Sequence, residues 1–378
     1  MSEEMRNNCC EARSEEAKKT SIGGQALIEG VMMRGPFVTA MAVRHTSGDI
    51  VMEEWPTKGK DKPRWMKLPL IRGVFNMVES MVSGYKCLMR SAELSGLEAE
   101  EEAAEAAKKA AKAAKKAAKK GIPTEPVTEV VENVAEVGEE AAEAAEEIQP
   151  VEEKPAKAEP KKSEKILFAI LMAISLVLGL GLSIVLFMWL PVFLYNSVLK
   201  EIFPALSEGH RWVQSVFEGV LRLAIFLGYV AAVSLMKDIK RVFMYHGAEH
   251  KSIFCYEKGL DLTVENVRQQ SRFHPRCGTS FLVLALIVGI LVSLCVPIYD
   301  NTVLRTVVKL LLIPEVVAVG YELIKLAGRK DNTFTRIISK PGIWVQRLTT
   351  KEPDDSMIEC AIAALKAVIP EDPDADKW

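Results

Sequence analysis

The sequence predicts a mainly α-helical, multi-spanning membrane protein with about four transmembrane helices and a small α+β region before them. Hydrophobic residues make up 49% of the 378 residues, and many of them lie in long uncharged runs. Residues 166–199 carry no charge over 34 positions, more than the roughly 20 residues that cross a bilayer as a helix. A basic stretch rich in histidine separates two later runs. These observations favour a membrane bundle with a polar site on one side.

The segment before the membrane region divides into a polar leader, residues 1–20, and an α+β region, residues 21–96. The leader lacks the apolar core of a signal peptide. Residues 40–45 and 50–55 alternate as strands around a Thr-Ser-Gly-Asp turn. Residues 70–91 place apolar side chains at helical spacing, and we expect this stripe to be a buried core face, with a membrane-surface role as the less favoured alternative.

A low-complexity linker, residues 97–164, follows the α+β region. It consists of Ala/Glu/Lys runs that could form a solvated helix from Glu98 to Lys120, and then of an acidic stretch punctuated by proline. Such a composition cannot bury a core, so we expect a tether. Its lysines lack interleaved aromatic residues, which argues against a nucleic-acid partner.

The membrane bundle is predicted over residues 165–328. After the first span, further spans are expected at 212–236, 277–299 and 303–326. The last candidate contains Pro314 and several charged residues. Glu315 and Glu322 are seven positions apart and share a helix face, so they either point into the bundle or lie near the two membrane surfaces.

The distribution of basic residues predicts the orientation. The loop of residues 237–276 holds eight Lys and Arg residues, which places it on the cytoplasmic side of the cytoplasmic membrane together with both termini. The bilayer is therefore an expected partner, and the cysteines should be reduced. The tail, residues 329–378, contains an amphipathic stretch that Asp354 can cap, and we expect it to pack on the cytoplasmic region.

The same loop carries a predicted metal site. His246 and His250 are one helical turn apart, and with Glu249 they spell H-x-x-E-H, in which two histidines bind zinc and the carboxylate is the general base. A third ligand is required. His274 and Cys277 are the first candidates, because Pro275 favours a turn back toward the helix. Glu257 and Cys255 are held in reserve.

Two functions agree with this pattern. The first is a divalent-metal enzyme, with zinc preferred, that hydrolyses a membrane-associated substrate at the cytoplasmic surface. The second is a non-enzymatic transporter or assembly factor, in which His246, His250, His274 and Cys277 form a closed structural site. The first function needs an open coordination position and a free Glu249, whereas the second needs neither.

Four segments together resemble a known bacterial family. They are Gly23-Gly24-Gln25-Ala26 through Met33-Arg34-Gly35, Tyr245 through Lys251, His274 through Phe281, and Pro341-Gly-Ile-Trp344. The chain is similar to the YqhQ family over about residues 21–96 and 165–369. The resemblance implies a multi-spanning membrane protein of unknown function, described as a predicted metal-dependent enzyme. It implies one shared site and supplies no reaction.

Overall fold

The structure, a computed structural model, describes residues 19–57, 63–97, 162–204, 211–295, 302–329, 332–372 and 374–377. The chain divides into two units, residues 1–97 with 183–378 and residues 98–182. The second unit is described only where it contains α5 (Lys162–Ile184). Most of the predicted leader and linker, including the helix expected from Glu98 to Lys120, lies outside the described residues.

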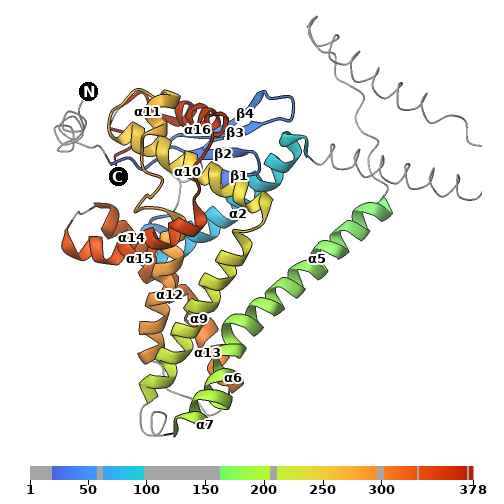
Figure 1. Ribbon diagram of the computed structural model, residues 1–378, viewed down its shortest axis with the longest axis vertical. Helices are drawn as coiled ribbons and strands as arrows, with labels where there is room; N and C mark the ends of the chain where they lie inside the picture. The colour runs from blue at the N-terminus through green and yellow to red at the C-terminus, as the bar shows by residue number, and fades with distance from the viewer. Residues whose placement is uncertain are drawn as a thin grey trace, which may run out of the picture. The chain divides into compact units, whose positions relative to one another are not determined.

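The first unit begins with an antiparallel sheet in the order β1-β2-β3-β4 (Figure 1). Its strands are β1 (Gly23–Leu27), β2 (Gly30–Arg34), β3 (Val38–Arg44) and β4 (Ile50–Pro56). The predicted hairpin is confirmed as β3 and β4, with Gly48 at a φ of 95° in its turn. The hairpin of β1 and β2 turns through Ile28 and Glu29 and is an addition to the predicted elements.

Both faces of the sheet are covered by helices, and successive side chains along each strand point to opposite faces. Val31 and Met33 point into a core shared with α10 (Lys237–Glu257) and α16 (Asp355–Val368). Met32 points to the opposite face, where α2 (Ile71–Ser95) packs through Cys87. Short helices η2 (Arg64–Lys67) and α11 (Val264–Arg268) lie next to α2 and α10 respectively. The predicted tail helix is confirmed as α16, with Asp354 accepting a hydrogen bond from the Met357 amide.

The predicted helix of residues 70–91 is confirmed as α2, but the expectation that its apolar stripe is buried is wrong. The four central side chains of the stripe are more than half exposed: Val78, Met81, Val82 and Tyr85. Small residues face inward instead. A Cβ at Gly73 would lie 2.8 Å from the Tyr321 Cβ, so the helix approaches its neighbours by backbone contact and directs its large apolar side chains outward.

Three helical segments of the described chain are long and apolar enough to cross a membrane: Ile174–Ile202, Trp212–Val233 and Gly278–Cys295. The first runs from α5 through η3 (Val185–Trp189), α6 (Leu190–Leu194), η4 (Tyr195–Leu199) and α7 (Lys200–Ile202). The others are α9 (Arg211–Val233) and α12 (Gly278–Cys295). These segments agree with three of the four predicted spans in position, and they indicate membrane association.

The fourth predicted span is divided near Leu312 into α13 (Thr302–Leu311) and α14 (Ile313–Arg329). Two of its charged residues form contacts between helices. Lys309 of α13 pairs with the buried Glu218 of α9, and Glu322 of α14 receives two hydrogen bonds from Arg72 of α2. Glu315 is exposed. Neither α13, with 10 residues, nor α14, with 17, is among the three described segments that are long and apolar enough to cross a membrane.

One further helix, α15 (Thr333–Thr349), packs against α12. A Cβ at its Gly342 would lie 2.5 Å from the Ser280 Cβ, so the two helices are in close contact there. After α15, the Lys351 amide donates to the Phe243 carbonyl of α10 at 2.8 Å. The tail therefore joins the apolar helices to the sheet region before it forms α16.

The packing of α16 predicts a stability effect. Ile358 is fully buried in the core between the sheet and α10, so Ile358→Ala should lower the free energy of unfolding by about 2–5 kcal/mol. The matched control is Ile337→Ala on α15, where the side chain is 59% exposed. Thermal unfolding of detergent-purified protein measures both, and equal effects would contradict the assigned core.

Candidate metal centre

The helix α10 places three functional side chains on one face. His246, Glu249 and His250 occupy positions i, i+3 and i+4, which lie above one another on a helix. Gly247 lies between them, where a Cβ would be 2.1 Å from the Lys351 carbonyl oxygen. Any larger residue would push the tail away from α10. The predicted helical spacing of the two histidines is thus confirmed.

The segment before α12 supplies the other side of the centre. A turn at Pro275 and Arg276 returns the chain toward α10, as predicted, and Cys277 immediately precedes α12. The Cys277 sulfur lies 3.2 Å from His246 Nε2. Ligand atoms of His246, His250 and Cys277 all lie within 4.8 Å of one another. Donors from two distant segments therefore converge at one point.

Hydrogen bonds to backbone carbonyls fix the tautomers of both α10 histidines. His246 Nδ1 lies 2.9 Å from the Thr349 oxygen, and His250 Nδ1 lies 2.6 Å from the Arg272 oxygen. A carbonyl oxygen only accepts, so each Nδ1 carries the proton and each Nε2 is directed to the cluster. His250 Nε2 is buried and makes no hydrogen bond within the described residues. An unpartnered buried nitrogen beside a thiol fits a metal ligand.

The charges in the cluster are strongly coupled. Burial opposes ionisation of Cys277, but the neighbouring imidazoles of His246 and His250 hold the pKa of its thiol well below the usual value. Burial likewise opposes protonation of His246, but the Cys277 sulfur and the Glu249 carboxylate raise the pKa of His246 to about 9. Without a metal, the cluster therefore favours a thiolate beside an imidazolium. A divalent cation would replace that proton.

Glu249 lies beside the cluster against the first strand. Its side chain is 5% exposed, and a Cβ on Gly24 would lie 2.9 Å from its Cγ. Burial raises the pKa of its carboxyl group, although the nearby His250 and His246 imidazoles and the Gly24 backbone oppose this shift. Gly24 also lines a cavity of about 290 Å³ between β1, the end of β2 and α2. The absent side chain of Gly24 thus leaves space for the Glu249 side chain, and the residues that line this cavity include neither Glu249 nor a donor of the cluster.

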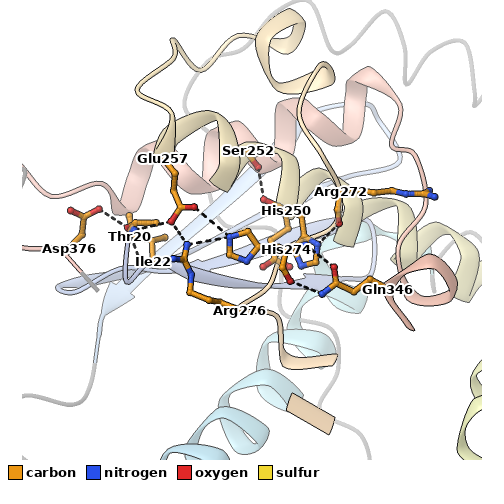
Figure 2. Close-up of polar contacts among 11 residues, drawn as sticks. Thr20, Ile22, His250, Ser252, Glu257, Arg272, His274, Arg276, Gln346 and Asp376 are labelled. Atoms are coloured by element: carbon orange, nitrogen blue, oxygen red, sulfur yellow. Dashed lines mark hydrogen bonds and ion pairs between the residues drawn. The ribbon is translucent and has the colours of Figure 1, made fainter. Parts of the chain in front are cut away.

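His274 lies beside His250 (Figure 2) but does not join the cluster of His246, His250 and Cys277. Its ring is centred 5.5 Å from that of His250, and its Nε2 is 3.6 Å from Glu257 and 3.3 Å from Arg276. Burial, together with the charges of His250 and Arg276, lowers the pKa of His274 to about 4 despite the nearby Glu257 carboxylate. The ring is therefore neutral and in contact with the buried ion pair of Glu257 and Arg276.

The two reserve ligands have other contacts. Glu257 accepts a hydrogen bond from the Thr20 amide at 2.9 Å and pairs with Arg276 (Figure 2). Cys255 Sγ lies 3.5 Å from the Asp261 carbonyl, and burial raises the pKa of this thiol to about 11. The structure therefore places neither of them in the cluster with His246.

Gln346 of α15 holds the loop that carries His274, and no sequence signal marks it. Its Oε1 accepts from the His274 amide at 2.7 Å, and its Nε2 donates to the His274 carbonyl at 2.6 Å and to Ser280 Oγ at 2.9 Å (Figure 2). The roles of the Thr349 and Arg272 carbonyls could not be predicted from the sequence either, because every residue has a backbone carbonyl. A polar residue in an amphipathic tail gives no indication of its distant partner.

The fold and the centre define a mainly helical protein with candidate membrane spans and a His/His/Cys cluster beside a small sheet. Residues 68–371 match the model of a family described as "Protein of unknown function (DUF1385)". The chain is 33% identical over 349 residues to "Uncharacterized protein YqhQ" of Bacillus subtilis (strain 168), which covers 92% of each chain. No solved structure matches. The protein belongs to this YqhQ-like family of unknown function.

The contacts of Gln346 predict that its amide stabilises the site loop. Gln346→Leu leaves the buried His274 amide and carbonyl without partners, and each such group costs about 1–3 kcal/mol. We expect a lower melting temperature in detergent. The control is Gln269→Leu, because Gln269 is exposed. A melting temperature unchanged by Gln346→Leu would refute this role.

Proposed function

We propose that this protein is a metal-dependent hydrolase that acts at the membrane surface. The convergence of two Nε2 atoms and one sulfur, all within 4.8 Å, is the observation that carries the proposal. Both imidazoles are oriented by backbone carbonyls, as is common for histidine ligands of metals. Three protein donors leave one coordination position open, which is the usual arrangement of a catalytic zinc site.

Zinc is the ion that the donor set favours. Two imidazoles and a thiolate match its preference for nitrogen and sulfur ligands, whereas magnesium and calcium prefer oxygen. When bound, such an ion supplies Lewis-acid activation of water and of a carbonyl or phosphoryl group. His246, His250 and Cys277 are the proposed ligands. His274 supports them through its contact with His250.

Glu249 is the proposed general base. It immediately precedes His250 on α10, its carboxylate is buried, and burial brings its pKa closer to neutrality. A base is most effective when its pKa lies near the working pH. The carboxylate would accept the proton of a water held between itself and the cluster.

The location of the substrate follows from the surroundings of the site. The cluster joins α10 to the start of α12, one of the three apolar helices. The basic residues of loop 237–276 favour a cytoplasmic orientation at the cytoplasmic membrane, with both termini on that side. We therefore propose a membrane-associated substrate. The H-x-x-E-H spelling favours a peptide bond as the group that is hydrolysed.

The second candidate function is non-enzymatic, and the position of His274 favours it. Its ring lies beside that of His250, so rotation of the side chain would add a fourth ligand and close the shell. The metal would then fasten loop 237–276 to the apolar helices of a transporter or assembly factor. An open, catalytic site needs Glu249 as a general base, whereas a closed, structural site functions without it.

Loss of a ligand should remove the metal. His250→Ala and the nearly isosteric Cys277→Ser should each reduce bound zinc at least about tenfold, because each removes a donor atom. Elemental analysis of detergent-purified protein measures this. The control is His45→Ala, because His45 lies in the β3–β4 turn and contacts Ser47. Wild-type levels of metal in both ligand variants would exclude the site.

Glu249→Gln separates the two functions. The variant keeps the size of the side chain but loses the basic carboxylate, so an enzyme should retain its metal and lose about a hundred- to ten-thousand-fold in rate. Complementation of a strain lacking the gene, with metal content measured in parallel, provides the test. Full complementation by Glu249→Gln, together with failure of His250→Ala, would favour the structural metal site.

A further inference from the structure

A second cavity shares one lining residue with the cavity lined by Gly24. It has a volume of about 260 Å³ and is lined by Ser21, Tyr321, Ile324, Lys325 and Arg329. Ser21 borders both cavities. Four of the five lining residues belong to α14, so one helix supplies most of the wall.

Two positively charged side chains line this cavity. Lys325 and Arg329 are one helical turn apart on α14, and neither forms an ion pair or a side-chain hydrogen bond with any described residue. Glu322, on the same helix, accepts hydrogen bonds from Arg72 Nε and Nη2 and from the Leu70 amide. Burial and the charges of Arg72 and Arg329 lower the pKa of Lys325, and the Glu322 carboxylate opposes this shift without reversing it. An anion would relieve this repulsion.

The lining groups fit a phosphate more closely than a carboxylate or chloride. Arg329 offers a planar fork that suits two phosphate oxygens, and Lys325 offers a compact charge with three donors. Tyr321 and Ser21 also line the cavity and carry uncharged hydroxyl donors, and the Tyr321 hydroxyl accepts a hydrogen bond from Asn76 at 2.8 Å. The volume leaves room for a group esterified to the phosphate.

The surroundings of the cavity favour a ligand with an apolar part. Ile324 lines the cavity itself, and the neighbouring Leu326 is 36% exposed. The helix α2 packs on α14 through Gly73 and carries the exposed stripe of Val78, Met81, Val82 and Tyr85. A helix with such a stripe suits the boundary between lipid headgroups and acyl chains. The cavity thus combines cations with a surface suited to lipid.

We propose that Lys325 and Arg329, with Ser21 and Tyr321, bind the phosphate group of an anionic amphiphile at the membrane surface. The ligand chemistry is a phosphate ester, carried either by a lipid headgroup or by a soluble molecule. This site is distinct from the His/His/Cys cluster, and it binds its ligand whether or not that cluster is catalytic.

The test is titration calorimetry on the full chain in a phosphate-free detergent. Dioctanoyl phosphatidic acid is the lipid probe, and glycerol 3-phosphate is the soluble probe. The double variant Lys325→Gln, Arg329→Gln should bind the lipid probe at least about tenfold more weakly, because it removes both cations proposed to contact the phosphate and hydrogen bonds to charged groups are the stronger ones. Lipid binding with negligible binding of glycerol 3-phosphate assigns the site to a headgroup. Comparable binding of both probes assigns it to soluble phosphate esters.

The control is Lys340→Gln, Arg347→Gln on α15, which removes the same two charges from exposed positions outside the cavity. It should bind the lipid probe as the wild type does. Equal weakening in both double variants, unchanged binding in the cavity variant, or no binding by the wild type would each overturn the proposal. His250→Ala should retain lipid binding, and the cavity variant should retain its metal content and melting temperature. Failure of this site and failure of the metal centre are therefore separable.

Discussion

The hydrogen bonds from the two α10 imidazoles to backbone carbonyls are the constraint on which the centre depends. Thr349 ends α15, and Arg272 lies in the loop before α12. Because carbonyls only accept, these contacts fix the orientation and the tautomer of each ring together. His250 Nε2 is thereby left buried with no hydrogen-bond partner among the described residues. A buried polar atom is costly when unpaired, so binding of a ligand to His250 Nε2 would be favourable.

Close backbone contacts make that arrangement sterically feasible. Gly247 lets the Lys351 carbonyl reach α10, Gly24 admits the Glu249 side chain, and Gly342 brings α15 against Ser280 of α12. Each contact joins segments that are far apart in sequence. A side chain at any of these positions would separate two walls of the site. These three glycines therefore permit the close packing around the centre.

The sheet region and the apolar helices are joined at two places next to the proposed sites. The tail passes from α15 along α10 to α16, and α2 is attached to α14 by Arg72 and Glu322. The first junction carries the His/His/Cys cluster, and the second borders the cavity with Lys325 and Arg329. Both proposed sites therefore lie where the sheet region and its helices contact the helical part of the chain that contains the candidate membrane spans. That location agrees with a substrate or ligand presented by the bilayer.

The sequence by itself determined the features that depend on local order along the chain. Long runs of mostly apolar residues located three apolar helices, helical spacing placed His246 and His250 on one face, and Asp354 marked the start of α16. These signals are local because helix periodicity and capping involve residues within one or two turns.

Only the tertiary structure decided which distant atoms meet. His274 and Cys277 lie in the same short segment, but the fold places Cys277 next to His246 and His274 next to Glu257. It directed the α2 stripe outward, because glycine and serine positions of that helix face its neighbours. It divided the fourth apolar segment and paired its charges with Glu218 and Arg72. Such choices depend on burial and on partners supplied by remote segments, and no local pattern encodes them.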